Sequence, residues 1–110
     1  EITRKYQNLE TGKWKSHKVA AYPLDFVPII ENVDVLYHES TFLQSEETLA
    51  QKTLHSTAQD AAKIALKANA KQLVLGHYST RYDGLGQFKE EAMQIFPNVL
   101  LADDGTTFDF

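Results

Sequence analysis

The residues that could do chemistry in this sequence are histidines and a glutamate set in short polar stretches. His38-Glu39 follows an apolar run at residues 33–37, His55 comes just ahead of a predicted helix, and His77 follows a second apolar run. An imidazole can bind a metal ion, or exchange a proton near neutral pH. The sequence contains no cysteine, so a transition-metal site would have to use His, Asp or Glu.

Alternating strands and helices are predicted to position these residues. The apolar runs at 33–37, 72–76 and 99–101 predict buried strands, and helical patterns cover 44–52, 57–69 and 86–95. Residues 2–9 and 13–21 predict a β-hairpin, and Pro28 restricts the following helix to a short one. This order favours an α/β or layered α+β fold with helices over a sheet, in one domain spanning residues 1–110.

The positions of the polar residues relative to these elements favour a shared site. In sheets with parallel strands, ligands gather beyond the carboxyl ends, where Glu39 and His77 are expected. His55 precedes a helix N-terminus, where backbone N–H groups favour an anion. Each residue also has a structural interpretation: a strand-end histidine can be purely structural, His55-Ser56-Thr57 can be only a helix cap, and Glu39 a solvated carboxylate. His17, in a lysine-rich strand, is assigned no role.

Composition limits the function classes. The 110 residues carry a net charge of −4, which disfavours indiscriminate binding to nucleic acid but not an enzyme that grips RNA at a few phosphates. No apolar run approaches the roughly 20 residues of a membrane span and no signal peptide is visible, so we expect a cytoplasmic protein. The sequence begins at Glu1 in strand-like material, and we expect it to be a piece of a longer protein.

Three blocks of the sequence resemble the ribonuclease Z family, in that family's order and at about its spacings. They are His38-Glu39-Ser40-Thr41-Phe42, His55-Ser56-Thr57-Ala58 and Leu75-Gly76-His77-Tyr78-Ser79-Thr80-Arg81-Tyr82. The resemblance runs from about residue 33 to the end. It implies the C-terminal half of a metallo-β-lactamase αββα sandwich, with a mixed sheet and helices on one face, the motifs lying in residues 33–110 and a hairpin-like segment in 1–22. It also implies a zinc-dependent endoribonuclease that removes the 3′ trailer from precursor tRNA, using two zinc ions and pairing as a homodimer.

The resemblance also implies roles for single residues. His77 corresponds to the family's last zinc ligand, His55 to a general acid, and Glu39 to the partner that orients His55. Ser79 and Arg81 are expected to bind substrate phosphate. For Arg81 an ion pair with Asp83 that stabilises the loop is an equal alternative.

Most of the family's zinc ligands are absent from this sequence. The His-x-His-x-Asp-His motif is missing, and the region expected to hold the bridging aspartate reads Lys18-Val19-Ala20-Ala21-Tyr22, without an acid. Asp25 lies too close to His38 to replace it. The family's flexible arm, which clasps the tRNA, is not visible either. We therefore expect this chain alone to be inactive. The alternatives are another hydrolase of the same fold (a thioesterase, lactonase or DNA nuclease) and a non-catalytic half-domain.

Overall fold

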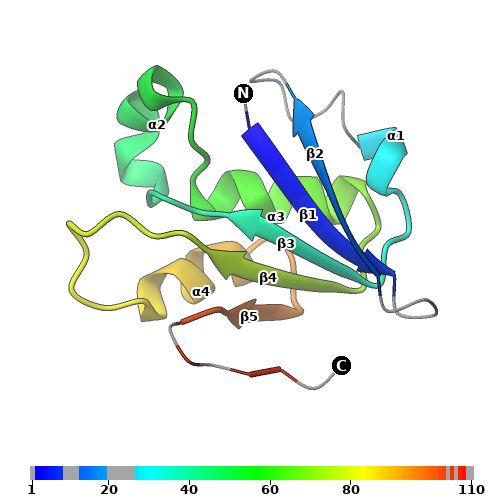
Figure 1. The fold of residues 1–110 in the computed structure, drawn as a ribbon. Coiled ribbons are helices and arrows are strands. Elements are labelled where there is room, and N and C mark those ends of the chain that lie inside the picture. Colours follow the sequence, from blue (N-terminus) through cyan, green and yellow to red (C-terminus); the bar gives the residue numbers. More distant parts are fainter. Residues whose placement is uncertain (1, 9–12, 20–26, 104, 106, 109–110) are drawn as a thin grey trace.

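A five-stranded mixed sheet forms the centre of the computed structural model, which describes residues 2–8, 13–19, 27–103, 105 and 107–108. The strands are β1 (Ile2–Asn8), β2 (Lys13–Val19), β3 (Val35–Glu39), β4 (Gln72–Gly76) and β5 (Val99–Leu101). Their spatial order is β2-β1-β3-β4-β5 (Figure 1). β1 is antiparallel to β2 and β3, whereas β3, β4 and β5 are parallel. The predicted hairpin pairing and mixed sheet are confirmed, while the predicted turn at residues 10–12 lies outside the described residues.

Helices cover one face of this sheet. They are α1 (Val27–Ile30), the 3₁₀ helix η2 (Gln44–Glu46), α2 (Glu47–Thr53), α3 (Ala58–Lys67) and α4 (Gly86–Met93). α3 and α4 lie against the same face (Figure 1). Their side chains form one apolar core with Leu36, Leu73 and Leu75 of the sheet. None of the helices in the described ranges is long and apolar enough to cross a membrane.

Helix α3 begins where its sequence signature places it. The Thr57 hydroxyl accepts the Asp60 N–H at 3.0 Å, and the Asp60 carboxylate accepts the Thr57 N–H at 3.1 Å. This reciprocal capping box satisfies two backbone donors that the helix leaves without partners. The predicted helix over 57–69 ends earlier, at Lys67, because Asn69 adopts a left-handed conformation with φ of 53°.

Strand β3 differs from its prediction in a way that matters for the site. It was expected at 33–37 but spans Val35–Glu39, so His38 and Glu39 belong to the strand and pair in register with Leu75 and Gly76 of β4. Parallel pairing continues through these two polar residues because β4 extends to the same level. Successive side chains of a strand point to opposite faces, so His38 and Glu39 cannot share a site.

The other helices also end at different residues from those predicted. The polar helix expected over 44–52 is a short 3₁₀ turn followed by α2, which ends at Thr53 because Leu54 adopts a left-handed φ of 59°. The helix expected over 86–95 ends at Met93. Phe88 and Ala92 face the core, and both are fully buried.

Candidate active site at the carboxyl ends of β3 and β4

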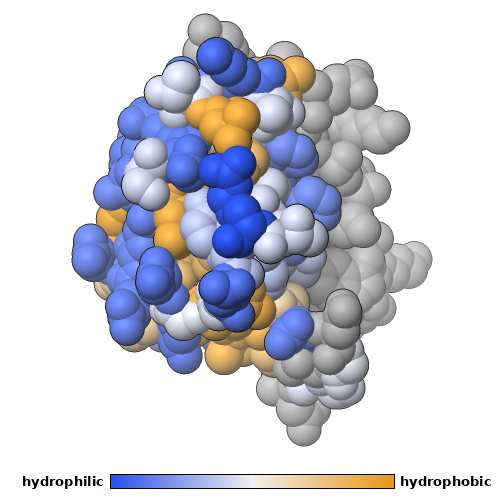
Figure 2. All heavy atoms as spheres, turned by 90° about the vertical axis from the view of Figure 1, so that its left-hand side faces the viewer, coloured by the Kyte–Doolittle hydropathy of each residue, from blue (hydrophilic) through white to orange (hydrophobic). Residues whose placement is uncertain are grey.

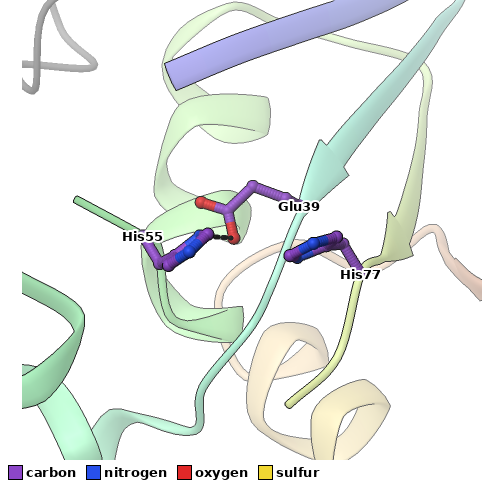
Figure 3. Close-up of side chains that lie close together, drawn as sticks. All are labelled: Glu39, His55 and His77. Atoms are coloured by element: carbon purple, nitrogen blue, oxygen red, sulfur yellow. Dashed lines mark ion pairs between the residues drawn. The ribbon is translucent and has the colours of Figure 1, made fainter. Parts of the chain in front are cut away.

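Three segments bring Glu39, His55 and His77 together at one edge of the sheet (Figure 3). Glu39 is the last residue of β3, and His77 directly follows β4. Because Glu39 pairs with Gly76 in the parallel ladder, the two strand ends lie at the same level. His55 comes from the loop between α2 and α3. The sequence-based expectation that these three residues share a site agrees with the geometry, and His38 is excluded from it because its side chain is fully buried.

Glu39 is the acceptor around which the loops are arranged. Its Oε1 accepts the Ser56 N–H at 2.6 Å, and its Oε2 accepts both the Thr41 N–H at 3.1 Å and the Thr41 hydroxyl at 2.8 Å. The His55 Nδ1 lies 3.6 Å from Oε2, and the Glu39 side chain is only 13% exposed. Charge-assisted bonds of this kind are the stronger ones in proteins. The carboxylate therefore fixes the backbone that carries His55 as well as its ring.

Thr41 was not singled out from the sequence, yet its hydroxyl contacts all three side chains. Besides donating to Glu39, it lies 3.2 Å from the His55 Nδ1 and 2.9 Å from the His77 Nδ1. A hydroxyl has one proton to donate, so with that proton on the Glu39 carboxylate it accepts from both imidazoles. The proton of each neutral ring is then on Nδ1, and Nε2 carries the lone pair. The only signal in the sequence was its place two residues after Glu39.

The two imidazole rings lie nearly parallel. Figure 3 shows the two rings side by side; their centroids are 5.4 Å apart and the interplanar angle is 22°. The Phe42 ring meets His55 edge to face at 6.2 Å. The His55 side chain remains 35% exposed, so a ligand can reach it.

The backbone at the end of β4 has an uncommon shape. His77 adopts a left-handed φ of 58°, a conformation in which histidine is one of the more tolerated residues. Before it, Gly76 lies under the Tyr37 ring: a Cβ at Gly76 would overlap the Tyr37 hydroxyl and lie 2.5 Å from its Cζ. Glycine at this position allows the tyrosine to lie across the strand.

Ser79 and Arg81 lie on the loop after His77 and flank the site. The Ser79 N–H bonds to the Thr41 carbonyl at 2.9 Å, and the Ser79 hydroxyl accepts the Arg81 N–H at 3.3 Å. The Arg81 guanidinium lies 5.5 Å from the centre of the Phe42 ring and pairs with Glu46 at 3.2 Å. The alternative pairing with Asp83 is therefore replaced by one with a residue of η2.

An open hollow of about 390 Å³ lies beside His77 and is lined by Tyr37, Gly76, His77, Tyr78, Ala102 and Asp103. Burial raises the pKa of Tyr78, and burial together with the charge of Glu39 raises the pKa of Tyr37. Figure 2 looks onto the edge of the molecule at which β3 and β4 end, and strongly hydrophilic side chains run down the middle of that face.

Glu39, His55 and His77 could also serve as ligands of a metal ion. Glu39, His55 and His77 offer ligand atoms that all lie within 4.8 Å of one another. Imidazole and carboxylate are ligands that zinc accepts. However, the Thr41 hydroxyl is already within bonding distance of all three side chains. The Nδ1 of His77 is bonded to Thr41, so the Nε2 of His77 is the nitrogen suited to zinc. A histidine that binds a metal commonly has its other ring nitrogen held by a neighbouring group in this way. Residues 20–26, which include Asp25 and part of the region searched for a bridging aspartate, lie outside the described residues.

The sequence matches no protein-family model, but it is similar to individual curated proteins. It is 49% identical over 85 residues to the ribonuclease Z of Parabacteroides distasonis, covering 77% of this chain and 28% of that protein. It is 51% identical over 73 residues to the ribonuclease Z of Phocaeicola vulgatus, covering 66% of this chain and 24% of that protein. The chain thus spans about a quarter of the length of the curated relatives it matches.

Solved structures agree with these relatives. A long form RNase Z from yeast aligns with a TM-score of 0.68 at 29% identity, over 83% of this chain and 12% of the yeast chain. Human tRNase Z, short form, aligns with a TM-score of 0.58 at 32% identity, over 74% of this chain and 26% of the human chain. The metallo-beta-lactamase fold protein YhfI from Bacillus subtilis aligns with a TM-score of 0.68 at 28% identity, over 74% of this chain and 33% of that one. The fold is that of part of a metallo-β-lactamase domain.

Proposed function

Since the chain belongs to the ribonuclease Z family, we propose that the protein containing it is a zinc-dependent endoribonuclease that removes the 3′ trailer from precursor tRNA. The observation that supports this most directly is the cluster of Glu39, His55 and His77 joined through the Thr41 hydroxyl. We further propose that the chain is the C-terminal portion of that enzyme, with the motifs in residues 33–110, and that the enzyme is a cytoplasmic homodimer.

Zinc would be held here by the Nε2 of His77, together with ligands from outside this chain. Two such ions would activate a water and neutralise charge at the scissile phosphate. A single imidazole holds zinc weakly, so the chain by itself is expected to be inactive.

His55 is the proposed general acid. With its Nδ1–H bonded to Thr41 and the Glu39 carboxylate 3.6 Å away, the ring is held so that Nε2 is the nitrogen left to donate a proton to the substrate. The departing 3′ oxygen of the tRNA body needs a proton when the bond to the trailer breaks. Glu39 orients the ring, a role supported by its buried and multiply bonded carboxylate.

Arg81 and Ser79 are proposed to bind substrate phosphate. The Arg81 guanidinium lies over the Phe42 ring, and the same ring also packs against His55. A guanidinium can grip a phosphate through two parallel bonds. The Glu46 side chain is 40% exposed, and ion pairs between exposed side chains are weak. Arg81 can therefore leave Glu46 and bind a phosphate instead.

The test is cleavage of a trailer-bearing tRNA precursor by the full-length protein, with and without a chelator. Cutting just after the acceptor stem that is lost with the chelator supports the proposal. His55→Ala and Glu39→Ala should each lower the rate by about 10²- to 10⁴-fold while weakening precursor binding far less. Gln51→Ala, at an exposed position of α2, is the matched control and should leave both unchanged.

Two results would contradict the proposal. A folded, zinc-loaded protein that does not cut the precursor would exclude tRNA maturation and favour another hydrolase of this fold, such as a thioesterase or lactonase. An equal loss of rate and binding in His55→Ala would contradict the role of general acid.

A further inference from the structure

Glu91, on α4, binds residues at the start of η2 and of α3, the two helices that follow the loops carrying the site. Its Oε1 and Oε2 lie 3.0 and 3.1 Å from the Gln44 N–H, and its Oε2 accepts the Gln59 N–H at 3.2 Å. Gln44 comes three residues after Thr41, and Gln59 three residues after Ser56. A single carboxylate thus joins the segment after β3 to the first turn of α3.

The two loops run side by side between this carboxylate and the site. The Phe42 N–H bonds to the Ser56 carbonyl at 3.3 Å, and the Ala58 N–H bonds to the Phe42 carbonyl at 2.9 Å. The Thr57 hydroxyl donates to the Gln44 side-chain oxygen at 2.7 Å. At the far end of the same pair of segments, Ser56 donates to Glu39 at 2.6 Å.

The helix that carries Glu91 is held firmly by the core. Phe88 and Ala92 are fully buried, and the Tyr78 and Tyr82 rings pack edge to face on Phe88 at 4.9 and 5.0 Å. Glu91 therefore presents its carboxylate from a fixed position to the first residue of η2 and the second residue of α3. The spacing of the two loops depends on what joins them.

We propose that Glu91 is a positioning residue for the Glu39–His55 pair, an inference that rests on the function proposed above. By holding the Gln44 and Gln59 N–H groups on one carboxylate, Glu91 adds a second link beyond the direct Phe42–Ser56 and Ala58–Phe42 bonds, and so helps to fix the separation of the two loops. That separation keeps Ser56 within bonding distance of Glu39 and His55 against Thr41. Glu91 itself touches neither His55 nor Glu39; it acts through the backbone.

The experiment compares Glu91→Ala and Glu91→Gln with Glu90→Ala in the full-length protein. Glu90 is the exposed neighbour on the same helix turn and serves as the control. We expect Glu91→Ala to lower kcat for precursor cleavage by about 10- to 100-fold, the scale of a small misplacement of catalytic groups, with KM within about twofold. Glu91→Gln keeps one acceptor oxygen and should lose less. Glu90→Ala should match the unaltered protein.

Hydrogen exchange at the Ser56 amide, followed by NMR, provides a readout independent of activity. Glu91 does not contact Ser56, so faster Ser56 exchange in Glu91→Ala shows that the effect travels along the loops. If only the Gln44 and Gln59 amides exchange faster while Ser56 and kcat are unchanged, Glu91 is merely a helix cap and the inference is overturned. If Glu91→Ala does not fold, Glu91→Gln decides by the same two readouts. If the unaltered protein cuts no precursor, the proposed function fails and Ser56 exchange alone decides on Glu91.

Discussion

Replacing Glu39 with glutamine should disrupt the site even though the two side chains have the same shape. The carboxylate accepts Ser56 N–H on Oε1, and Thr41 N–H and hydroxyl on Oε2. Glutamine has one oxygen. If that oxygen keeps the Ser56 bond, the side-chain NH₂ faces the Thr41 N–H, donor against donor. With the Glu39 side chain only 13% exposed, an N–H group left without an acceptor costs about 1–3 kcal/mol.

The expected loss in the free energy of unfolding differs between variants in a defined order. Glu39→Ala removes the acceptors of two backbone N–H groups, so it should cost about twice as much as Glu39→Gln, roughly 2–5 kcal/mol. Thr41→Val removes only the hydroxyl and keeps the backbone bond, so it should cost least. The measurement is the free energy of unfolding of the full-length protein in urea. A Glu39→Gln variant within about 0.5 kcal/mol of the unaltered protein would refute the reasoning from the acceptor count.

The effects of Glu39→Gln and His55→Ala on the cleavage rate should depend on each other. Glu39 and His55 act as one unit if the carboxylate orients the imidazole, so their losses should not multiply. Glu39→Gln together with His55→Ala should cleave no more slowly than His55→Ala alone. Rate losses that multiply fully in the double variant would show that Glu39 acts by some route other than His55.

Three further predictions concern the surroundings of the site. Gly76→Ala should destabilise the protein by about 1–3 kcal/mol, because its Cβ would lie 2.5 Å from the Tyr37 Cζ; Tyr37→Ala in the same chain should recover part of that loss in urea unfolding. Glu46→Gln should lower KM for the precursor about 1.5- to 5-fold by releasing Arg81 from an exposed ion pair, which steady-state kinetics would detect. Burial raises the pKa of Tyr78, so its contribution to stability is present below about pH 10 and is lost as pH rises further; Tyr78→Phe should flatten the stability profile above pH 10.

The features that the sequence predicted well depend on local patterns. Thr57 and Asp60 lie three residues apart, so their capping box could be recognised without knowing the fold. The buried strand at 72–76 was equally local, a short apolar run ending at glycine. The resemblance to known blocks then supplied Glu39, His55 and His77, whose proximity no local pattern could demonstrate.

The features that could not be predicted depend on contacts between distant segments. Thr41 meets His77 only because β3 and β4 pair in one particular register, and a shift of one residue would turn Thr41 to the other face. An ion pair with nearby Asp83 was one of two alternatives for Arg81, but its partner in the structure is Glu46 of η2. Glu91 bonds to Gln44, and nothing in the sequence predicted a contact between these two distant residues.

The parallel pairing of β3 with β4 also has a consequence for the order of folding. Parallel neighbours need a long crossover, here through α2 and α3, before their ends can meet. Closing so long a stretch of chain is slow compared with forming a helix or a hairpin. We therefore expect Glu39 and His77 to come together late in folding, after α3 has packed on the sheet. A substitution in the core-facing side of α3, such as at Ala62, should lower the fraction of newly made full-length protein that becomes active. It should affect the turnover number of each correctly folded molecule less.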